Sequence, residues 1–161
     1  MRILAIDPGY ERLGIAILEK NINQKETVLF SDCLRTSATL PFEDRLLELG
    51  LRIESLIQEY LPTSLSIENL FISKNQKTAM RVAEVRGMLI YLARKYNLSV
   101  KEYNPMQIKL AVTGDGKSTK DQMMKMVSML VKNIKPKALD DEYDAIAIGL
   151  AFFAYEKNIF R

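Results

Sequence analysis

Four acidic residues that lie far apart in the sequence occupy positions where carboxylates could do chemistry. Asp7 follows the apolar run ILAI and Glu68 follows SLSI, so each comes at the end of an expected strand. Asp141 and Asp144 lie three residues apart in LDDEYDAIAIGLA and share one face of an expected helix. Strand ends and a helix start can bring such groups together. Converging carboxylates can bind divalent ions about 4 Å apart, the arrangement that two-metal phosphoryl transfer uses.

Each acid also has an ordinary structural explanation. Asp7 precedes a proline-glycine turn, where an aspartate accepts backbone hydrogen bonds. An acid after a strand, such as Glu68, is often simply solvated. We expect Asp140 to cap the last helix, and Asp141 and Asp144 could gain from the helix dipole. The combination favours a metal site, because two acids at the head of an apolar stripe are costly to bury without a cation or hydrogen-bond donors.

The composition excludes several kinds of catalytic site. The sequence of 161 residues contains no histidine and one cysteine, Cys33. Imidazole bases, Ser-His triads and zinc sites of the histidine and cysteine type are therefore ruled out. Carboxylate oxygens remain as metal ligands, and they suit hard ions such as Mg²⁺ or Mn²⁺. A single cysteine cannot form an internal disulfide, which fits a reducing, cytoplasmic location.

The charge of the chain is small but unevenly distributed. The net charge is +3, yet residues 101–137 contain eight lysines against three acids, and the acidic stretch LDDEYD follows at once. A basic surface beside an acidic pocket is what an enzyme acting on a polyanion needs, with lysines on the phosphates and carboxylates on the metal. The simpler interpretation is a solvated, lysine-rich face.

Turn signals and apolar spacing predict an ordered α/β domain over residues 1–161. Strands are expected at 2–6, 14–18, 27–34, 64–67 and 99–103, the first three as consecutive antiparallel strands. Helices are expected at 41–60 and 77–96, after Asn104, after a cap formed by Ser118 and Asp121, and over the apolar run 145–155. This pattern predicts a mixed sheet flanked by helices. We expect no signal peptide, and no apolar run reaches the ~20 residues of a membrane span.

Four sequence blocks, in order across nearly the whole chain, resemble the RuvC family of bacterial Holliday-junction resolvases. The blocks are AIDPGYERLGIAI, LSIENLFISKNQKTAMRVAEVRGMLI, YNPMQIKLAVTGDGKSTKDQM and LDDEYDAIAIGLA. They contain the motifs AxxRG, QxK-x-x-VTGxGxxxK and DxxDAxAI, which are highly specific in combination. The DPG turn or the lysine loop alone would be a weak signal.

The resemblance implies a ribonuclease-H-like fold, with a five-stranded mixed sheet flanked by helices on both faces. It implies a homodimer that resolves four-way DNA junctions by paired symmetric nicks, leaving 5′ phosphates, in homologous recombination and DNA repair. It implies two Mg²⁺ ions per subunit, with Mn²⁺ as an expected substitute. It also implies a cytoplasmic enzyme that acts with the RuvA–RuvB branch-migration complex and with no membrane.

The same resemblance assigns functional residues to positions in this sequence. The catalytic and metal-binding acids of the family match Asp7, Glu68, Asp141 and Asp144. Its two active-site lysines match Lys109 and Lys120. Its DNA-contacting aromatic residue matches Phe71, where stacking on an unpaired base is expected; a core phenylalanine is the alternative. Weaker candidates for phosphate contacts are Lys74, Asn75, Lys77, Arg81 and Lys117.

Small residues repeat along the second expected helix. Ala79, Ala83 and Gly87 recur at four-residue spacing, which permits close approach of another helix. In the family the corresponding helix lies at the dimer interface. Packing of this ridge against the protein's own sheet is the alternative.

Three other functions are open from the sequence. An ATPase of the actin and sugar-kinase type begins in a similar way, but the chain is too short for its second lobe. Another ribonuclease-H-like nuclease, acting on structured RNA or branched DNA, is a nearer alternative. A catalytically silent junction-binding module is the third, although all four acids are retained.

Overall fold

The computed structural model describes residues 1–69 and 76–156, with the side chains of Gln76 and Lys77 outside the description. Five strands and five helices occur in these ranges. They are β1 (Arg2–Asp7), β2 (Arg12–Glu19), β3 (Thr27–Arg35), α1 (Phe42–Tyr60), β4 (Ser64–Glu68), α2 (Gln76–Lys95), β5 (Ser99–Tyr103), α3 (Pro105–Thr113), α4 (Lys120–Leu130) and α5 (Asp140–Tyr155).

The strands form one mixed sheet in the order β3-β2-β1-β4-β5. β1 pairs antiparallel with β2, and β2 with β3, as the hairpin signals predict. β4 and β5 run parallel to β1. β1 is therefore the central strand, and its carboxyl end lies at the same edge of the sheet as the carboxyl ends of β4 and β5. The five-stranded mixed sheet expected from the sequence is confirmed.

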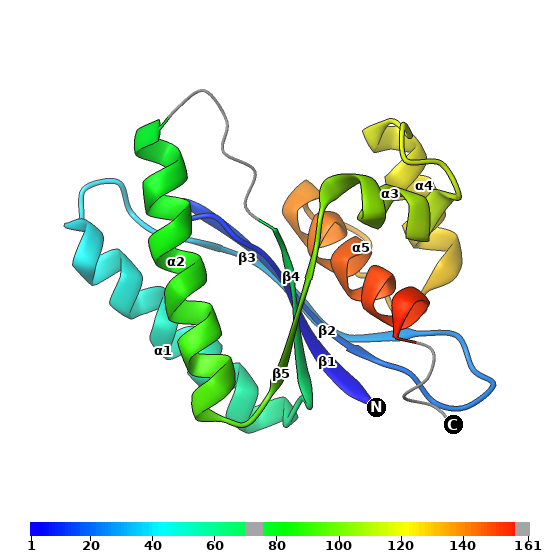
Figure 1. Cartoon of the computed structure of the whole chain (residues 1–161), viewed down its shortest axis with the longest axis horizontal. Helices are drawn as coiled ribbons and strands as arrows, with labels where there is room; N and C mark the ends of the chain where they lie inside the picture. The colour runs from blue at the N-terminus through cyan, green and yellow to red at the C-terminus, as the bar shows by residue number, and fades with distance from the viewer. Residues whose placement is uncertain (70–75, 157–161) are drawn as a thin grey trace.

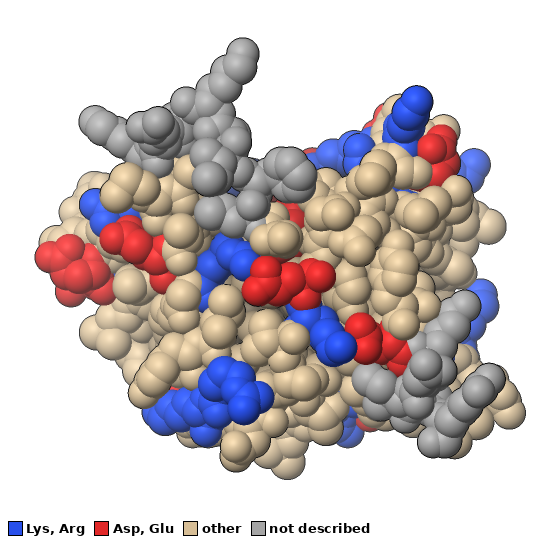
Figure 2. Space-filling view, in the orientation of Figure 1, with Lys and Arg blue, Asp and Glu red and all other residues tan. Residues whose placement is uncertain are grey.

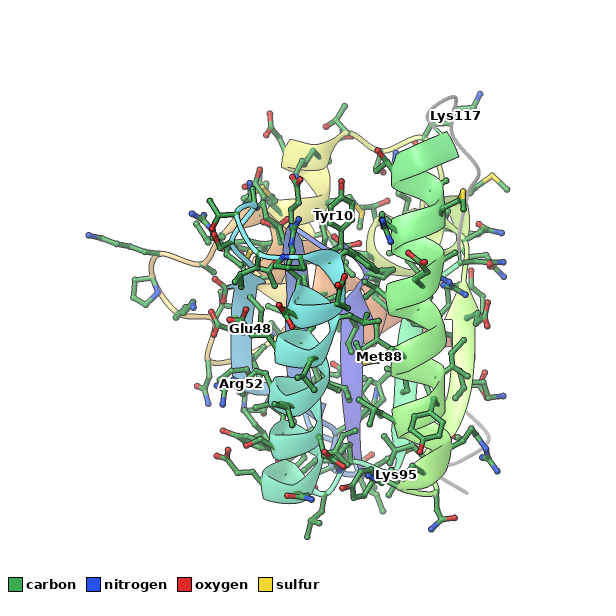
Figure 3. The ribbon with its side chains drawn as sticks, turned by 90° about the vertical axis from the view of Figure 1, so that its left-hand side faces the viewer. Tyr10, Glu48, Arg52, Met88, Lys95 and Lys117 are labelled. Atoms are coloured by element: carbon green, nitrogen blue, oxygen red, sulfur yellow. The ribbon has the colours of Figure 1, made fainter. Side chains whose placement is uncertain are left out.

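Alternating side chains divide the sheet into two packed faces. Leu4 and Ile6 belong to a core formed with α1 and α2, whereas Ile3 and Ala5 belong to a second core formed with α5. Figure 1 shows α1 and α2 on one side of the sheet and α3, α4 and α5 on the other. Figure 3 shows α1 and α2 side by side over the strands. Helices thus cover both faces, as expected.

Helix α5 is the most buried helix of the described chain, as its apolar sequence predicts. Its residues from Ala145 to Phe153 are buried, and the helix packs mainly on β2, β1 and α3. Gly149 allows this close packing, because a Cβ atom there would lie 2.6 Å from a methyl carbon of Leu18. Ser66 on β4 donates a buried hydrogen bond of 2.9 Å to the main-chain oxygen of Ile148. The first turn of α5 is consequently held at the edge where β1 and β4 end.

Two predicted helix caps are wrong. Helix α4 is capped by Thr119 with Gln122, not by Ser118 with Asp121, because the Ser118 hydroxyl bonds within the preceding loop, to Thr113 Oγ1 at 2.5 Å. The following hydroxyl therefore takes the capping position. The predicted start of α3 is confirmed, since Asn104 forms a capping box there.

Asp140 is not the cap of α5. It is the first residue of the helix, and its side chain lies 3.1 Å from Lys120. Leu139 is the N-cap residue, and its main-chain nitrogen donates a hydrogen bond of 2.9 Å to the carboxylate of Glu142. Glu142 is fully buried and also accepts from Ser31 at 2.6 Å and pairs with Lys135 at 2.9 Å. This carboxylate fastens the start of α5 to β3.

No helix within residues 1–69 and 76–156 is long and apolar enough to cross a membrane.

Gly14 fixes how closely α5 approaches the sheet, which a single methyl group can test. A Cβ atom at Gly14 would clash with the main-chain oxygen of Asp141. We expect Gly14→Ala to destabilise the protein by roughly 1 to 3 kcal/mol, because α5 must move away. Thermal and urea unfolding measure the loss. Gly50→Ala in α1 is the control, since its Cβ would lie 3.5 Å from Met88, an ordinary contact. Equal stability of the two variants would contradict the close-approach argument.

Candidate active site

The sheet register places Asp7 beside the start of α5. Asp7 pairs directly with Gly14 on β2, and Gly14 pairs with Cys33 on β3. Directly opposed residues of antiparallel strands project to the same face. Asp141 lies over Gly14, the residue without a side chain in this row. Asp7 and Cys33 therefore flank the place where α5 begins.

Glu68 reaches the same edge through the parallel pairing. Ile6 pairs with Ile67, so the next residue of each strand, Asp7 and Glu68, ends its strand at the same level. Ser66, two residues before Glu68, already faces α5 through its bond to Ile148. By the period of two along a strand, Glu68 projects to that face as well.

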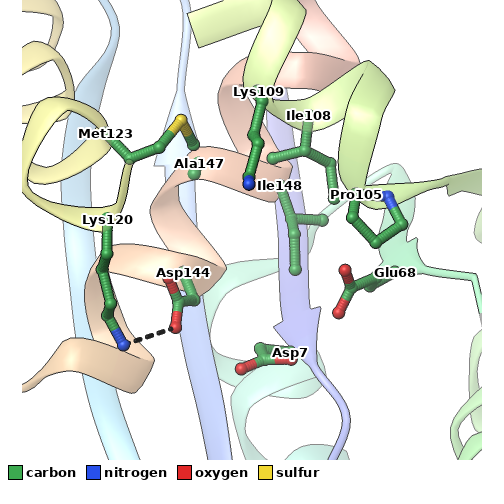
Figure 4. Close-up of a pocket in the computed structure, with 10 residues that line it drawn as sticks. All are labelled: Asp7, Glu68, Pro105, Ile108, Lys109, Lys120, Met123, Asp144, Ala147 and Ile148. Atoms are coloured by element: carbon green, nitrogen blue, oxygen red, sulfur yellow. Dashed lines mark hydrogen bonds and ion pairs between the residues drawn. The ribbon is translucent and has the colours of Figure 1, made fainter. Parts of the chain in front are cut away.

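These elements enclose a cavity of about 250 Å³ at the edge of the sheet. Figure 4 shows the carboxylates of Asp7, Glu68 and Asp144 turned into one space, with Lys109 extending toward it from α3. The side chains of Pro105, Ile108, Met123, Ala147 and Ile148 form the apolar part of the wall. Acids at one end and hydrocarbon at the other give a partly desolvated acidic site.

Burial, together with neighbouring acids, raises the pKa of the Asp7 carboxyl from 3.8 to about 7. Burial is the largest cause, and the negative charges of Glu68, Asp144 and Asp141 follow. Lys120 partly offsets them. The ionised form of Asp7 is therefore disfavoured here, and a cation beside it would favour that form.

The other two acids of the cavity are shifted in the same direction. Burial, followed by the charge of Asp144, raises the pKa of Glu68, while Arg86 lowers it. Burial also raises the pKa of Asp144, against the opposing effect of Lys120. All three carboxyls thus disfavour ionisation together, which is typical of groups that share a functional site.

Lys120 lies between two acids of α5. Its ammonium nitrogen is 3.1 Å from Asp140 and 3.4 Å from Asp144. Half of the side chain is exposed, so the ammonium is accessible to solvent as well as to Asp144. Asp140 consequently acts on the site through its pairing with this lysine and through its charge, which helps to raise the pKa of Asp144.

Asp141 lies beside the cavity, and its side chain does not line it. Its Oδ2 atom pairs with the guanidinium of Arg12 and lies 3.4 Å from the sulfur of Cys33. Its charge nevertheless reaches Asp7. In the described part of the chain, no three acids or cysteines are close enough together to hold an ion as they stand. Asp141, a predicted metal ligand, is thus turned away from the cavity and toward the guanidinium of Arg12.

Arg12 and Arg86 lie at this site although the sequence pattern did not assign them to it. Arg86 on α2 has a buried guanidinium that donates to the main-chain oxygen of Glu68 and to Glu102 at 2.9 Å. It therefore holds the end of β4 from the far side of the sheet. Its place in the AxxRG motif was the one signal in the sequence for Arg86. Arg12 had none.

The predicted DNA-contacting residues are only partly placed. Phe71, Lys74 and Asn75 lie outside the described residues, and so does the side chain of Lys77. Arg81 is exposed on α2, where it stacks 4.0 Å from the ring centroid of Phe42.

Lys117 is exposed in the loop before α4, and its main-chain nitrogen donates to Asp115 at 2.9 Å.

The lysine-rich segment 101–137 is neither a bare solvated face nor a continuous basic patch. Lys101, Lys120 and Lys135 each pair with an acid of the last helix or its cap. Figure 2 shows basic side chains dispersed among acidic ones over the face it presents. Part of the segment's charge therefore serves to hold α5.

Comparison with known proteins identifies relatives over nearly the full length. The chain matches the family described as "Crossover junction endodeoxyribonuclease RuvC" over residues 3–152. It is similar to the protein of that name from Brachyspira hyodysenteriae, with 40% identity over 94% of this chain and 92% of the relative. It is also similar to the one from Caldicellulosiruptor saccharolyticus, with 39% identity over 99% and 96%.

Solved structures agree with this fold. The Thermus thermophilus RuvC structure superposes with a TM-score of 0.86 and 25% identity, covering 99% of this chain and 98% of that one. T. thermophilus RuvC in complex with a Holliday junction substrate superposes with a TM-score of 0.92 and 24% identity, covering 99% and 97%. With the full-length relatives and the matched family, these likenesses place the chain in the RuvC family of crossover junction endodeoxyribonucleases.

Proposed function

We propose that this protein is a structure-selective endonuclease that resolves four-way DNA junctions by paired symmetric nicks. The observation that carries the proposal is the convergence of Asp7, Glu68 and Asp144 with Lys109 and Lys120 around one cavity. Relatives along nearly the whole chain bear the name crossover junction endodeoxyribonuclease, and one neighbour in structure was solved with a Holliday junction. Cytoplasmic DNA undergoing recombination or repair is the proposed setting.

The donor set of the site fits Mg²⁺. Only carboxylate oxygens are offered, which suits a hard divalent ion, and Asp7 lies centrally between Glu68 and α5. The raised pKa of Asp7 reflects negative charge that an added cation would neutralise. We propose that Asp7, Glu68, Asp141 and Asp144 would together hold two ions. Bound there, the ions would polarise the scissile phosphate and promote deprotonation of the attacking water.

The lysines supply fixed positive charge at the same place. Lys109 extends into the cavity from α3, and Lys120 reaches its rim from α4. Each could bind an oxygen of the scissile phosphate, where a positioned cation stabilises developing negative charge. The apolar wall limits water around these charges and strengthens their effect.

A second subunit would pack on α2. Ala83 and Gly87 are exposed and Ala79 is partly buried, so the small-residue ridge does not pack mainly on the protein's own sheet. Met80 and Tyr91, on the same helix, are 66% and 65% exposed. A two-fold dimer through this face would present two active sites to a junction with approximate two-fold symmetry. Contact with a RuvA–RuvB motor is proposed from family membership alone.

Junction cleavage tests the function directly. Purified protein is mixed with a synthetic mobile four-way junction, a duplex of the same sequence and a structured RNA, in Mg²⁺ or in chelator. We expect symmetric nicks on two opposed strands of the junction, only with the ion, and with 5′ phosphate ends. Preferential cutting of the RNA would favour the other ribonuclease-H-like activity instead.

Removing charge from the acids should separate binding from cleavage. We expect Asp7→Asn and Glu68→Gln each to lower the cleavage rate by at least about 10³-fold, because each variant removes a carboxylate ligand of the proposed ions. Junction affinity in a gel-shift assay should stay within a few-fold of wild type. Glu48→Gln, an exposed acid on α1, is the control. Wild-type cleavage by Asp7→Asn would refute the assignment.

The raised pKa of Asp7 predicts that Asp7→Asn stabilises the metal-free protein. Between pH 3.8 and about 7 the folded state binds more protons than the unfolded state, so stability falls as pH rises through this window. In EDTA above pH 7, we expect the variant to be more stable by on the order of 2 to 4 kcal/mol. The difference should vanish near pH 4. Thermal unfolding measures it, and the variant should gain less stability than wild type when Mn²⁺ is added.

The dimer proposal can be tested at Gly87. A Cβ atom added at this position would meet no other part of the described chain within 4 Å, so the single subunit has room for a side chain. We expect Gly87→Arg to give folded monomers in sedimentation velocity, because a large charged group would occupy the proposed contact. Ser128→Arg, at an exposed position of α4, should remain dimeric. Dimers in both variants would move the interface elsewhere.

A further inference from the structure

Arg12 forms an ion pair with Asp141, one of the proposed metal ligands. Its guanidinium pairs with Oδ2 of Asp141, across 129 positions of sequence. The sulfur of Cys33 lies 3.4 Å from the same oxygen atom. This oxygen therefore already has two neighbours that can donate to it, and one of them carries a full positive charge.

The register of the sheet fixes this arrangement. Arg12 and Gly14 lie two residues apart on β2, so both face α5. Asp141 sits over Gly14, and Cys33 is the residue opposite Gly14 on β3. Arg12 is thus attached to the strand directly next to the carboxylate. The contact belongs to the packing of α5 on β2.

Exposure allows the pair to separate. The Arg12 side chain is 49% exposed, whereas that of Asp141 is 19% exposed. The guanidinium can turn into solvent without opening the core, while the carboxylate stays where the helix holds it. A half-exposed ion pair of this kind is weak enough to be displaced by a stronger competitor.

We propose that Arg12 is a built-in competitor for the divalent ion at Asp141. The inference rests on the metal site of the proposed function. The guanidinium and a divalent ion are both positively charged, so each repels the other at Oδ2 of Asp141 and the two cations compete for that carboxylate. Only molecules in which Arg12 has left the carboxylate bind the ion with full affinity. The apparent affinity therefore falls as the fraction of such molecules falls. Arg12 therefore sets the metal concentration at which the site fills.

Metal binding without substrate tests the competition. Mn²⁺ binding is measured by calorimetry and by electron paramagnetic resonance at constant ionic strength, for wild type, Arg12→Gln and Arg12→Lys. We expect Arg12→Gln to bind Mn²⁺ roughly 3- to 10-fold more tightly. Arg12→Lys should fall between the two, because it keeps the charge but loses the planar fork. The rise in melting temperature on adding Mn²⁺ should be larger for Arg12→Gln than for wild type.

Arg2 provides a matched control. It is also the first residue of a strand, pairs with Glu19 at 2.9 Å, and has a side chain that is 40% exposed. Arg2→Gln removes the same charge away from the acids and should leave Mn²⁺ affinity unchanged. An equal gain for Arg2→Gln and Arg12→Gln would reduce the effect to net charge and overturn the proposal.

The remaining outcomes separate this inference from the proposed metal site. Asp7→Asn should weaken Mn²⁺ binding strongly. If it does not, the metal site itself is wrong. If Asp7→Asn weakens binding while Arg12→Gln binds as wild type or more weakly, the metal site stands and the competition is refuted. Thermal unfolding in EDTA checks that each variant is folded. If Arg12→Gln does not fold, the Mn²⁺ affinity of Arg12→Lys tests the competition instead.

Discussion

The close contact between α5 and the middle of the sheet is the constraint on which the site depends. Two glycines make it possible, Gly14 beneath the first turn of the helix and Gly149 against Leu18. Because the helix is buried along most of its length, its position is set by packing and not by the charges at its start. The protein can therefore hold mutually repelling acids together, since the apolar contact supplies the stabilising free energy.

Basic side chains from three different elements reduce the repulsion between the acids at this edge of the sheet. Lys120 of α4 is paired with Asp144, Arg12 of β2 with Asp141, and Arg86 of α2 with the main chain of Glu68. Asp7 is the acid left with the largest increase in pKa. It is also the central acid, at the end of the strand that joins the antiparallel and parallel parts of the sheet. Asp7, the acid whose negative charge is least compensated, thus lies at the centre of the acids that could bind an added ion.

Local patterns in the sequence predicted the elements well and the contacts between them poorly. The short apolar run before the Pro8-Gly9 turn identified β1, and the apolar run 145–155 identified a buried helix. Strand order could not be derived, because β4 pairs with β1 only through burial that no local pattern specifies. The cap of α4 was misplaced by one residue, although Thr119 and Gln122 fit the capping-box pattern and Ser118 lacks the glutamate or glutamine that this pattern needs three residues on.

For the site, the residues with a motif were found, and those whose role depends on long-range register were missed. The spacing of Asp141 and Asp144 predicted a shared helix face, yet nothing in the sequence showed that Asp141 would meet Arg12 from a strand at the other end of the chain. Arg86 stood in a recognised motif, but its reach around the sheet edge to Glu68 and Glu102 required the packing of α2. Residues that modulate the acids are set by tertiary geometry.

The first turn of α5 carries acids with different partners at successive angles around its axis. Asp140 points to α4, Glu142 enters the interior toward β3, and Asp144 opens into the cavity. Each step along the helix turns the side chain by about 100°. Inserting or deleting one residue between this turn and Gly149 would turn every acid by about 100° relative to the buried part of the helix, so that none would keep its present partner. The number of residues between these acids and Gly149 therefore fixes the direction in which each acid points. Homologous chains should differ in length before or after this segment of α5 but not within it.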